Sequence, residues 1–194
     1  MASYVDLTTV FKPYIKMNAA VSVLEDAVLQ MGIDAAEAGI NIGLARTITL
    51  VPADAPSARL YTPAPCGTRI DIDDAATITA VGGVAFDAEL FRCTPLQHRD
   101  PSGQWRPYDT IETRSGWTVD SWGDVSVTGT WGWTVIPPNV TEACKVLAKD
   151  VLANRDVAFG MHAFTEYAAQ RVRTNPVVWE LIGDLRGIKS FGVA

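Results

Sequence analysis

The feature that most limits the fold is a change of sequence pattern at two points along the chain. Up to about residue 46, apolar residues recur three and four positions apart, as in a helix that buries one face. Residues 47–136 instead hold short runs of β-branched and aromatic residues separated by Pro, Gly and Asp, which is typical of an antiparallel sheet. Helical spacing returns after Pro137 and Pro138. Neither helical half can bury its apolar stripe alone, so the two halves are expected to pack together.

This pattern predicts an α+β fold in which a small α-helical bundle carries an inserted antiparallel β subdomain. The N-terminal helices are expected within residues 17–45 and the C-terminal helices within 139–186, with the β insertion at about 47–136. The 194 residues suffice for one domain with a large insertion, and we expect 1–194 to be a single domain. Residues 187–194 alternate apolar and polar side chains and are expected to form an extended tail.

In the N-terminal half, Gly32 followed by Asp34 predicts a glycine C-cap and then an aspartate N-cap, and hence two helices. A short helical turn is expected between Thr8 and Ile15, broken near Pro13. The apolar spacing predicts one buried helical face, which comprises Val21, Leu24, Val28, Met31, Ala35, Ala38 and Ile42.

In the C-terminal half, Asn139 and Glu142 have the spacing of a capping box. A second helix is expected at about 164–172, and a last short helix is expected to begin at Asn175 and to end at Gly187. The predicted apolar stripe of the first of these helices comprises Val140, Ala143, Cys144, Leu147, Val151 and Leu152. That of the last helix comprises Val177, Val178, Leu181, Ile182 and Leu185.

The central segment is predicted to contain short strands joined by turns. Turn signals such as SWGD at 121–124 separate the β-rich runs, and residues 94–109 are expected to form one long exposed loop. The predicted strands lie within residues 48–51, 58–62, 68–73, 77–81 and 124–136.

The composition bears on the classes of function that the chain can have. Its net charge of −6 argues against a dedicated nucleic-acid binder, although DNA can pass an acidic surface without being held. Three cysteines without a CxxC pair indicate synthesis in a reducing compartment and no disulfide framework. The sequence has no signal-peptide core and no apolar run long enough to span a bilayer, so we expect a soluble protein without membrane contact.

Groups that could carry catalysis are scarce, and we expect no enzyme. The two histidines, His98 in a polar loop and His162 in a connection, have no nucleophile motif around a Ser or Cys to serve. No glycine-rich phosphate-binding loop occurs, so no cofactor is predicted.

Two groups of side chains contain metal-ligating residue types, and metal binding is predicted at neither. Asp71 and Asp73 would share one face of a strand and could chelate a metal together with Asp74. The spacing is not that of a calcium loop, and a strand end turning into a polar loop explains the same residues. Cys66, Cys93 and His98 lack both the spacing and the fourth ligand of a zinc site.

The tryptophans are concentrated in the β region, where five of the six lie between Trp105 and Trp133. Trp131 and Trp133 alternate along a predicted strand and would share a face. A small β subdomain that needs large side chains for its core explains this best. An interface with another protein or a sugar-binding surface is the alternative.

Residues 125–156, VSVTGTWGWTVIPPNVTEACKVLAKDVLANRD, combine a Val-x-Gly-x-Trp-Gly strand, two prolines and an alanine-rich helix. This segment resembles the head-to-tail adaptor (connector) proteins of siphophages. The segments AAEAGINIGLARTITLVPADAPSARLYTP at 35–63 and GTRIDIDDAATITAV at 67–81 are similar to the matching part of that family. The resemblance spans roughly residues 20–186.

The resemblance implies a structural virion protein that is synthesised in the cytoplasm of a bacterial host and assembles as a homo-oligomeric ring, expected to be a dodecamer. The ring would lie below the portal protein, extend the DNA channel, and join the capsid to a neck (stopper) or tail-terminator protein. Portal contacts are expected at Arg186, Ile188, Lys189, Phe191 and Val193. Contacts between subunits or with the next ring are expected at His98, Arg99, Trp105, Trp131 and Trp133.

Two other hypotheses stay open. The chain could be a carbohydrate- or protein-binding module that uses its tryptophan-rich β surface. It could also be a hydrolase in which Asp71, Asp73 or His98 is the catalytic group.

Overall fold

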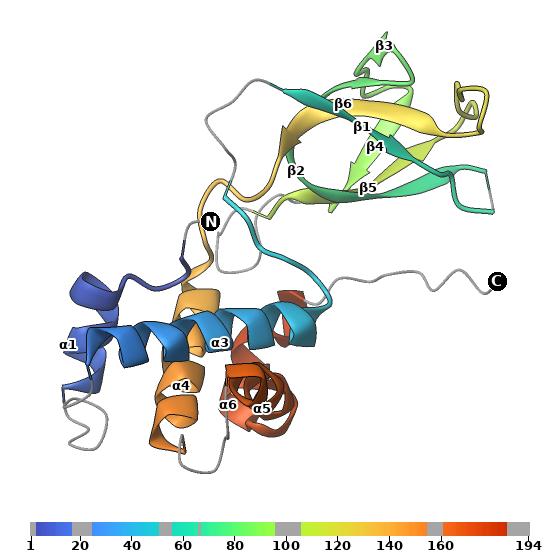
Figure 1. The fold of residues 1–194 in the computed structure, drawn as a ribbon. Helices are drawn as coiled ribbons and strands as arrows, with labels where there is room; N and C mark the ends of the chain where they lie inside the picture. Colours follow the sequence, from blue (N-terminus) through green and yellow to red (C-terminus); the bar gives the residue numbers. More distant parts are fainter. Residues whose placement is uncertain are drawn as a thin grey trace. The chain divides into compact units, whose positions relative to one another are not determined.

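The computed structural model of the protein describes residues 3–16, 25–50, 56–65, 67–95, 106–154 and 161–185 (Figure 1). The described residues form helices and a six-stranded antiparallel sheet, which confirms the α+β class. Residue contacts divide the chain into two compact units. The described part of the first, the helical unit, lies within residues 1–47 and 136–188, and that of the second, the sheet unit, within 48–135.

The helical elements of the first unit that the structure describes begin with a short π-helix, η1, and a single turn, α1, and the last of them is the 3-10 turn η2. The longer helices are α3 and α4, and α5 and α6 follow (Figure 1). α3 packs against both α4 and α5, and α6 packs against α4. The bounds are η1 Leu7–Phe11, α1 Lys12–Ile15, α3 Asp26–Leu44, α4 Pro138–Ala153, α5 Met161–Thr174, α6 Pro176–Ile182 and η2 Gly183–Leu185.

The α3 helix differs from the prediction in two respects. It is continuous from Asp26 to Leu44, so the predicted break at Gly32 is wrong. The predicted face is only partly right: Ala35 is buried and Val28 and Ala38 are half-buried, but Met31 and Ile42 are exposed. Ile33 and Ile40, which were not predicted, are fully buried. Val21 and Leu24 lie outside the described residues.

Three glycines explain why α3 turns this other face inward. A Cβ atom on Gly32 would lie 2.5 Å from Leu152 Cγ, and one on Gly43 would lie 2.4 Å from Val172 Cγ1. At Gly39 it would lie 2.8 Å from the backbone carbonyl carbon of Ala168. The glycines therefore mark the line along which α4 and α5 approach α3 most closely, and they do not mark helix ends.

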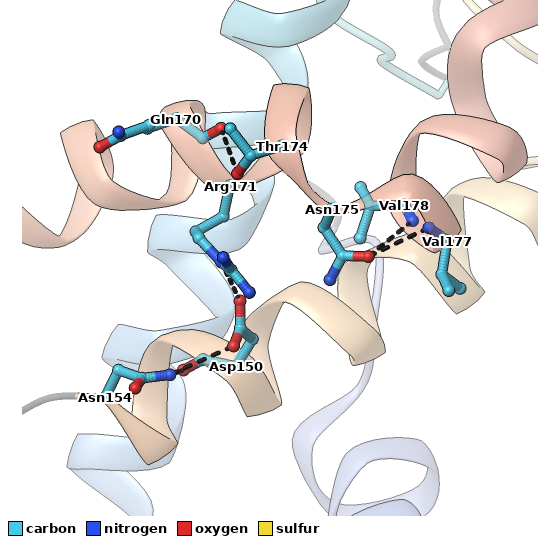
Figure 2. Close-up of polar contacts among 8 residues, drawn as sticks. All are labelled: Asp150, Asn154, Gln170, Arg171, Thr174, Asn175, Val177 and Val178. Carbon is cyan, nitrogen blue, oxygen red and sulfur yellow. Dashed lines mark hydrogen bonds and ion pairs between the residues drawn. The ribbon is translucent and has the colours of Figure 1, made fainter.

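The C-terminal helices follow the prediction more closely. All six residues of the predicted α4 stripe are buried, although Pro137 and not Asn139 stands at the N-cap position. The predicted last helix begins as expected, because Asn175 Oδ1 accepts hydrogen bonds from the backbone N–H groups of Val177 and Val178 (Figure 2). α6 ends at Ile182 and a 3-10 turn follows to Leu185, before the predicted end at Gly187, which itself lies outside the described residues. Of its predicted stripe, Val178, Ile182 and Leu185 are buried, but Val177 is exposed.

An ion pair adds to the packing of α4 against α5. Arg171 Nε donates to Asp150 Oδ2 over 2.5 Å, and Asp150 Oδ1 also accepts from Asn154 (Figure 2). The hydrogen bond to Asp150 raises the pKa of Arg171. The two helices are thus joined by a charge-assisted bond beside their apolar contact.

The N-terminal segment packs on α3 through contacts that the sequence pattern did not predict. The Tyr4 hydroxyl donates to Asn41 Oδ1 over 2.5 Å, and the Tyr4 backbone N–H donates to Glu37 Oε1 over 2.6 Å. Burial raises the pKa of Glu37. The predicted helical turn between Thr8 and Ile15 is present, but Pro13 lies in the first turn of α1 and does not break it.

The sheet unit has the strand order β1-β6-β2-β5-β4, with β3 paired to β2, and every named pair is antiparallel. The two strands predicted at 68–73 and 77–81 are one long strand, β2. β4 and β5 occupy both ends of the segment predicted as a loop, which is a correction at Thr94 and at residues 108–109. The bounds are β1 Ser57–Tyr61, β2 Arg69–Val81, β3 Val84–Ala85, β4 Phe91–Thr94, β5 Tyr108–Thr113 and β6 Val125–Trp131.

The β6 strand supplies much of the core of the sheet unit. Val125, Val127 and Trp131 point inward and are buried, and the residues between them are half-buried. Gly129 also faces inward, and a Cβ atom there would lie 2.2 Å from the carbonyl oxygen of Thr77 in β2. The predicted strand at 48–51 amounts, in its described part, to a single parallel bridge from Leu50 to Trp133.

Candidate interaction surfaces

Asp71, Asp73 and Asp74 lie at the point where β2 bends. The strand pairs with β5 through its first half and with β6 through its second half, and its register with β5 shifts between Asp71 and Ala75. The bulge lets the Asp74 carbonyl accept a hydrogen bond from Gly132 N over 2.6 Å, while Asp74 Oδ2 accepts from Trp133 Nε1 over 2.6 Å. The acidic run therefore joins β2 to the chain that follows β6.

The other two carboxylates of the run face different partners. Asp71 pairs with Arg69 at 2.7 Å, and Asp73 pairs with Arg59 of β1 at 2.6 Å. No group of three or more His, Cys, Asp or Glu side chains that could hold a metal ion occurs among the residues that the structure describes. The spatial arrangement gives the three aspartates separate structural partners and does not direct them to one point.

Asp73 of β2 belongs to a cluster with Arg59 and Tyr61 of β1 and Trp131 of β6. The Tyr61 hydroxyl donates to Asp73 Oδ2 over 3.0 Å, and the Arg59 guanidinium lies over the Trp131 ring, 4.6 Å from its centroid. Burial, with the adjacent Asp73 carboxylate, raises the pKa of Tyr61 to about 12. The cluster fastens the edge strand β1 to the bend in β2.

We expect the phenol of Tyr61 to titrate near pH 12, against about 10 for an exposed tyrosine. Because the folded-state pKa lies above the unfolded value, the neutral phenol contributes stability that is present below pH 10 and lost between pH 10 and 12. An alkaline absorbance titration of the wild type minus that of Tyr61→Phe isolates this group. A difference curve centred near pH 10 would contradict the described cluster.

The cysteines of the described residues are unsuited to reaction or zinc binding. Cys93 and Cys144 are buried free thiols, and burial raises the pKa of both, that of Cys93 to about 12. Thiolate is the reactive and metal-binding form, so both thiols stay protonated at neutral pH. Cys66 and His98 lie outside the described residues, and His162 lies in α5, not in a connection as predicted.

Of the predicted contact residues, the structure describes only Trp131 and Trp133. Trp131 is 6% exposed and donates to the Ser57 carbonyl, and Trp133 is 2% exposed. Trp131 thus belongs to the core cluster of the sheet unit, as the core interpretation predicts, and neither ring is available on the surface of this chain. The remaining predicted contact residues, namely His98, Arg99, Trp105, Arg186, Ile188, Lys189, Phe191 and Val193, lie outside the described residues.

The sequence pattern did not single out Trp122, which has the most exposed ring among the described tryptophans at 88%. It stands on a turn that Asp120 organises: Asp120 Oδ1 accepts from the backbone N–H groups of Trp122 and Asp124 at 2.8 and 2.9 Å. The Asp124 carboxylate accepts from Thr62 Oγ1 at 2.6 Å, and Gly123 takes a φ of 88°. The turn therefore fixes the backbone of Trp122 while its large aromatic ring is exposed to solvent.

A groove of about 860 Å³ lies along β4 and β5 and reaches the start of β2. Its charged side includes Arg69, Arg92 and Glu112, and because Glu112 is paired in register with both arginines, all three lie on one face of the sheet. Its aromatic side includes Phe91, which stacks on Phe86 and on Trp117 at centroid distances of 6.1 Å. We call it the β4–β5 groove.

The helical unit exposes apolar side chains as well. Met31 and Ile42 of α3 are 36% and 50% exposed, and Val177 and Trp179 of α6 are 52% and 38% exposed. Single exposed apolar residues are normal on a soluble surface. Here they lie on regular helices whose backbones are already fixed by packing, so they can form contacts at little ordering cost.

None of the helices in the described part of the chain is both long enough and apolar enough to cross a membrane. No protein-family model matches the chain, and neither do the curated proteins or the solved structures with which it was compared.

Proposed function

We propose that this chain is a structural virion protein, a head-to-tail adaptor that forms a ring below the portal of a long-tailed phage. The ring extends the DNA channel and joins the capsid to the next neck or tail component. In this proposal the α3, α4, α5 and α6 helices are the body of a bundle, and the sheet unit is an insertion between α3 and α4. The expected ring is a dodecamer of this chain with the portal protein above it and a stopper or tail-terminator protein below.

The observation that carries the proposal is the resemblance of residues 125–156 to the siphophage adaptor family. The structure gives each part of that segment a packing role. Gly129 permits the contact of β6 with β2, Gly132 bonds to the bend of β2, and Pro137 stands at the start of α4. The described residues of this segment thus serve packing, as a structural subunit requires.

The charge and the surface support the same proposal. An acidic chain with a net charge of −6 does not hold DNA that passes through a channel. Exposed apolar side chains on fixed helices and turns, above all Trp122, suit a subunit that contacts several neighbours. Burial of Trp131 and Trp133 argues against a sugar site at these two rings, whereas Trp122 of the same tryptophan-rich segment is exposed.

The proposal predicts that the C-terminal segment attaches the chain to the portal. A variant ending at residue 186 is expected to keep the circular dichroism spectrum of the full chain and to lose at least about 30-fold in affinity for purified portal protein, because strand or groove docking is removed. Sedimentation of each variant with portal rings measures the loss. Replacing Lys189 alone with alanine serves as a milder control, and portal binding of normal strength by the truncated chain would contradict the assignment.

A further inference from the structure

Within its described residues, the chain passes between the helical unit and the sheet unit twice. The first connection lies between Thr47 and Ile48, and the second lies between Val135 and Ile136. Four residues at these connections form no hydrogen bond or ion pair in the described part of the chain, namely Thr47, Thr134, Val135 and Ile136. The first three of them are also exposed. A backbone that is neither bonded nor buried can change its φ and ψ angles at little cost.

The helical unit fixes the chain up to the residue before Thr47. α3 ends at Ala45, which has a left-handed φ of 52° and donates its N–H to the Ile42 carbonyl at 3.2 Å. The Arg46 N–H donates to the Asn41 carbonyl at 3.1 Å. These are the two backbone bonds of a Schellman cap, so the chain belongs to the rigid helical unit as far as Arg46. Thr47 is then the single unbonded residue of the first connection.

The sheet unit fixes the chain on its own side of both connections. The Trp133 backbone N–H donates to the Thr49 carbonyl at 2.7 Å, and Trp133 Nε1 donates to Asp74 Oδ2 at 2.6 Å. Ile48 and Trp133 are both buried. The parallel bridge between Leu50 and Trp133 therefore holds the two connections side by side where they enter the sheet unit.

The second connection ends at the start of α4. Pro137 is buried and has a φ of −57°, and its carbonyl accepts from the backbone N–H groups of Val140 and Thr141 at 2.9 and 3.2 Å. The chain is thus fixed at Trp133 on one side and at Pro137 on the other. Only residues 134–136 lie unbonded between these two points.

We propose that the two connections form a hinge, about which the sheet unit swings as a rigid body relative to the helical unit. The axis passes through Thr47 and residues 134–136, since backbone angles can change there without breaking a hydrogen bond. Two short connections allow rotation about the line that joins them, and they oppose the twisting that a single connection would permit. The hinge is a property of the single chain and goes beyond the adaptor function. In an assembly that holds the helical units, it lets the sheet units take a second position while both units stay folded.

Distances between two spin labels, measured by pulsed electron paramagnetic resonance on the full chain, test the hinge. Asp34→Cys in α3 and Leu60→Cys in β1 place one label on each unit, at exposed positions. Cys66→Ser leaves only the two buried cysteines as native thiols. The distribution of distances between the units is expected to be at least about twice as wide as that of a pair within the helical unit, Asp34→Cys with Glu166→Cys in α5.

Three further variants locate the pivots. Val135→Pro is expected to narrow the distribution between the units to the width of the pair within the helical unit. Proline fixes its own φ and restricts the residue before it, and Ile136 is already restricted by Pro137. Ala45→Gly is the matched control, because it changes a residue inside the bonded cap of α3, and it is expected to leave the width unchanged. Two glycines inserted after Thr47 are expected to widen the distribution beyond that of the wild type, because a longer first connection no longer opposes twisting.

A wild-type distribution between the units as narrow as that within the helical unit would overturn the hinge, because the two units would then be one rigid body. An unchanged width in Val135→Pro would overturn the pivot at residues 134–136, and a wider distribution in Ala45→Gly would overturn the pivot at Thr47. An unchanged width after the glycine insertion would overturn the single axis. Urea unfolding checks that each variant keeps its fold. None of these outcomes bears on the adaptor function, which portal binding and the position of the chain in the neck test separately.

Discussion

Gly39→Ala is expected to destabilise the helical unit by about 2–3 kcal/mol, the range of strongly overpacked cores. In an exposed helix the same change would stabilise by about 1 kcal/mol, because alanine is the better helix former. Here the added methyl would lie 2.8 Å from the backbone carbonyl carbon of Ala168 and 3.0 Å from the backbone nitrogen of Ala169. Backbone atoms cannot rotate aside, so α5 has to move away from α3 and loses contact along its length.

Gly43→Ala supplies the matched control for this prediction. Its added methyl would meet Val172 Cγ1 at 2.4 Å, which is a side-chain atom that a second substitution removes. In the Val172→Ala background, Gly43→Ala is expected to cost at least about 1 kcal/mol less than it does alone. Urea unfolding followed at 222 nm measures all of these variants. A Gly39→Ala protein as stable as the wild type would contradict the described packing of α3 on α5.

Gly129→Ala is expected to cost about 3 kcal/mol or more and to separate β6 from the second half of β2. A Cβ atom at this position would lie 2.2 Å from the carbonyl oxygen of Thr77 and 3.3 Å from Ile78 Cα, so backbone again blocks it on the neighbouring strand. The register between these strands shifts on both sides of this point, which brings the two backbones unusually close.

The neighbouring Thr128 provides the control, because it lies on the other face of β6 and is half-buried. Thr128→Ala is expected to cost less than about 1 kcal/mol, the span of strand propensities. Hydrogen exchange of the β2 and β6 amides measures the local effect of each substitution. Unchanged hydrogen-exchange protection of both strands in Gly129→Ala would show that β6 does not pair with β2 as described.

The segments with a strong and unambiguous period could be predicted from the sequence. The α4 stripe from Val140 to Leu152, the Asn175 cap of α6 and the change to β structure in the middle of the chain are all confirmed. In α4 the large apolar side chains of the stripe are also the buried ones, so the spacing of hydrophobic residues predicts the buried face directly.

The prediction failed where small residues decide the packing. α3 turns Gly32, Gly39 and Gly43 toward its neighbours and leaves Met31 and Ile42 in water, the reverse of what side-chain size indicates. The β4 and β5 strands were not predicted, because they are short and contain Arg92, Glu112 and several threonines. These polar residues interrupt the alternation of apolar and polar side chains that identifies a strand. β5 forms by pairing with β2, and β4 forms by pairing with β5; a short sequence window does not contain these non-local contacts.

Little of the candidate site could be predicted in the same way. The SWGD turn was visible in the sequence, and a tryptophan between turn residues points outward, which is the signal that could have identified Trp122. The groove had no local signal, because Arg69, Arg92 and Glu112 come from three strands and meet only through their register.

The most direct test of the adaptor function is cryo-electron microscopy of the neck of a virion assembled with this chain. The proposal predicts a ring of twelve copies directly below the portal, with the channel running through its centre and one sheet unit visible in each subunit. A neck that assembles without the chain, or a single copy located away from the portal axis, would contradict it.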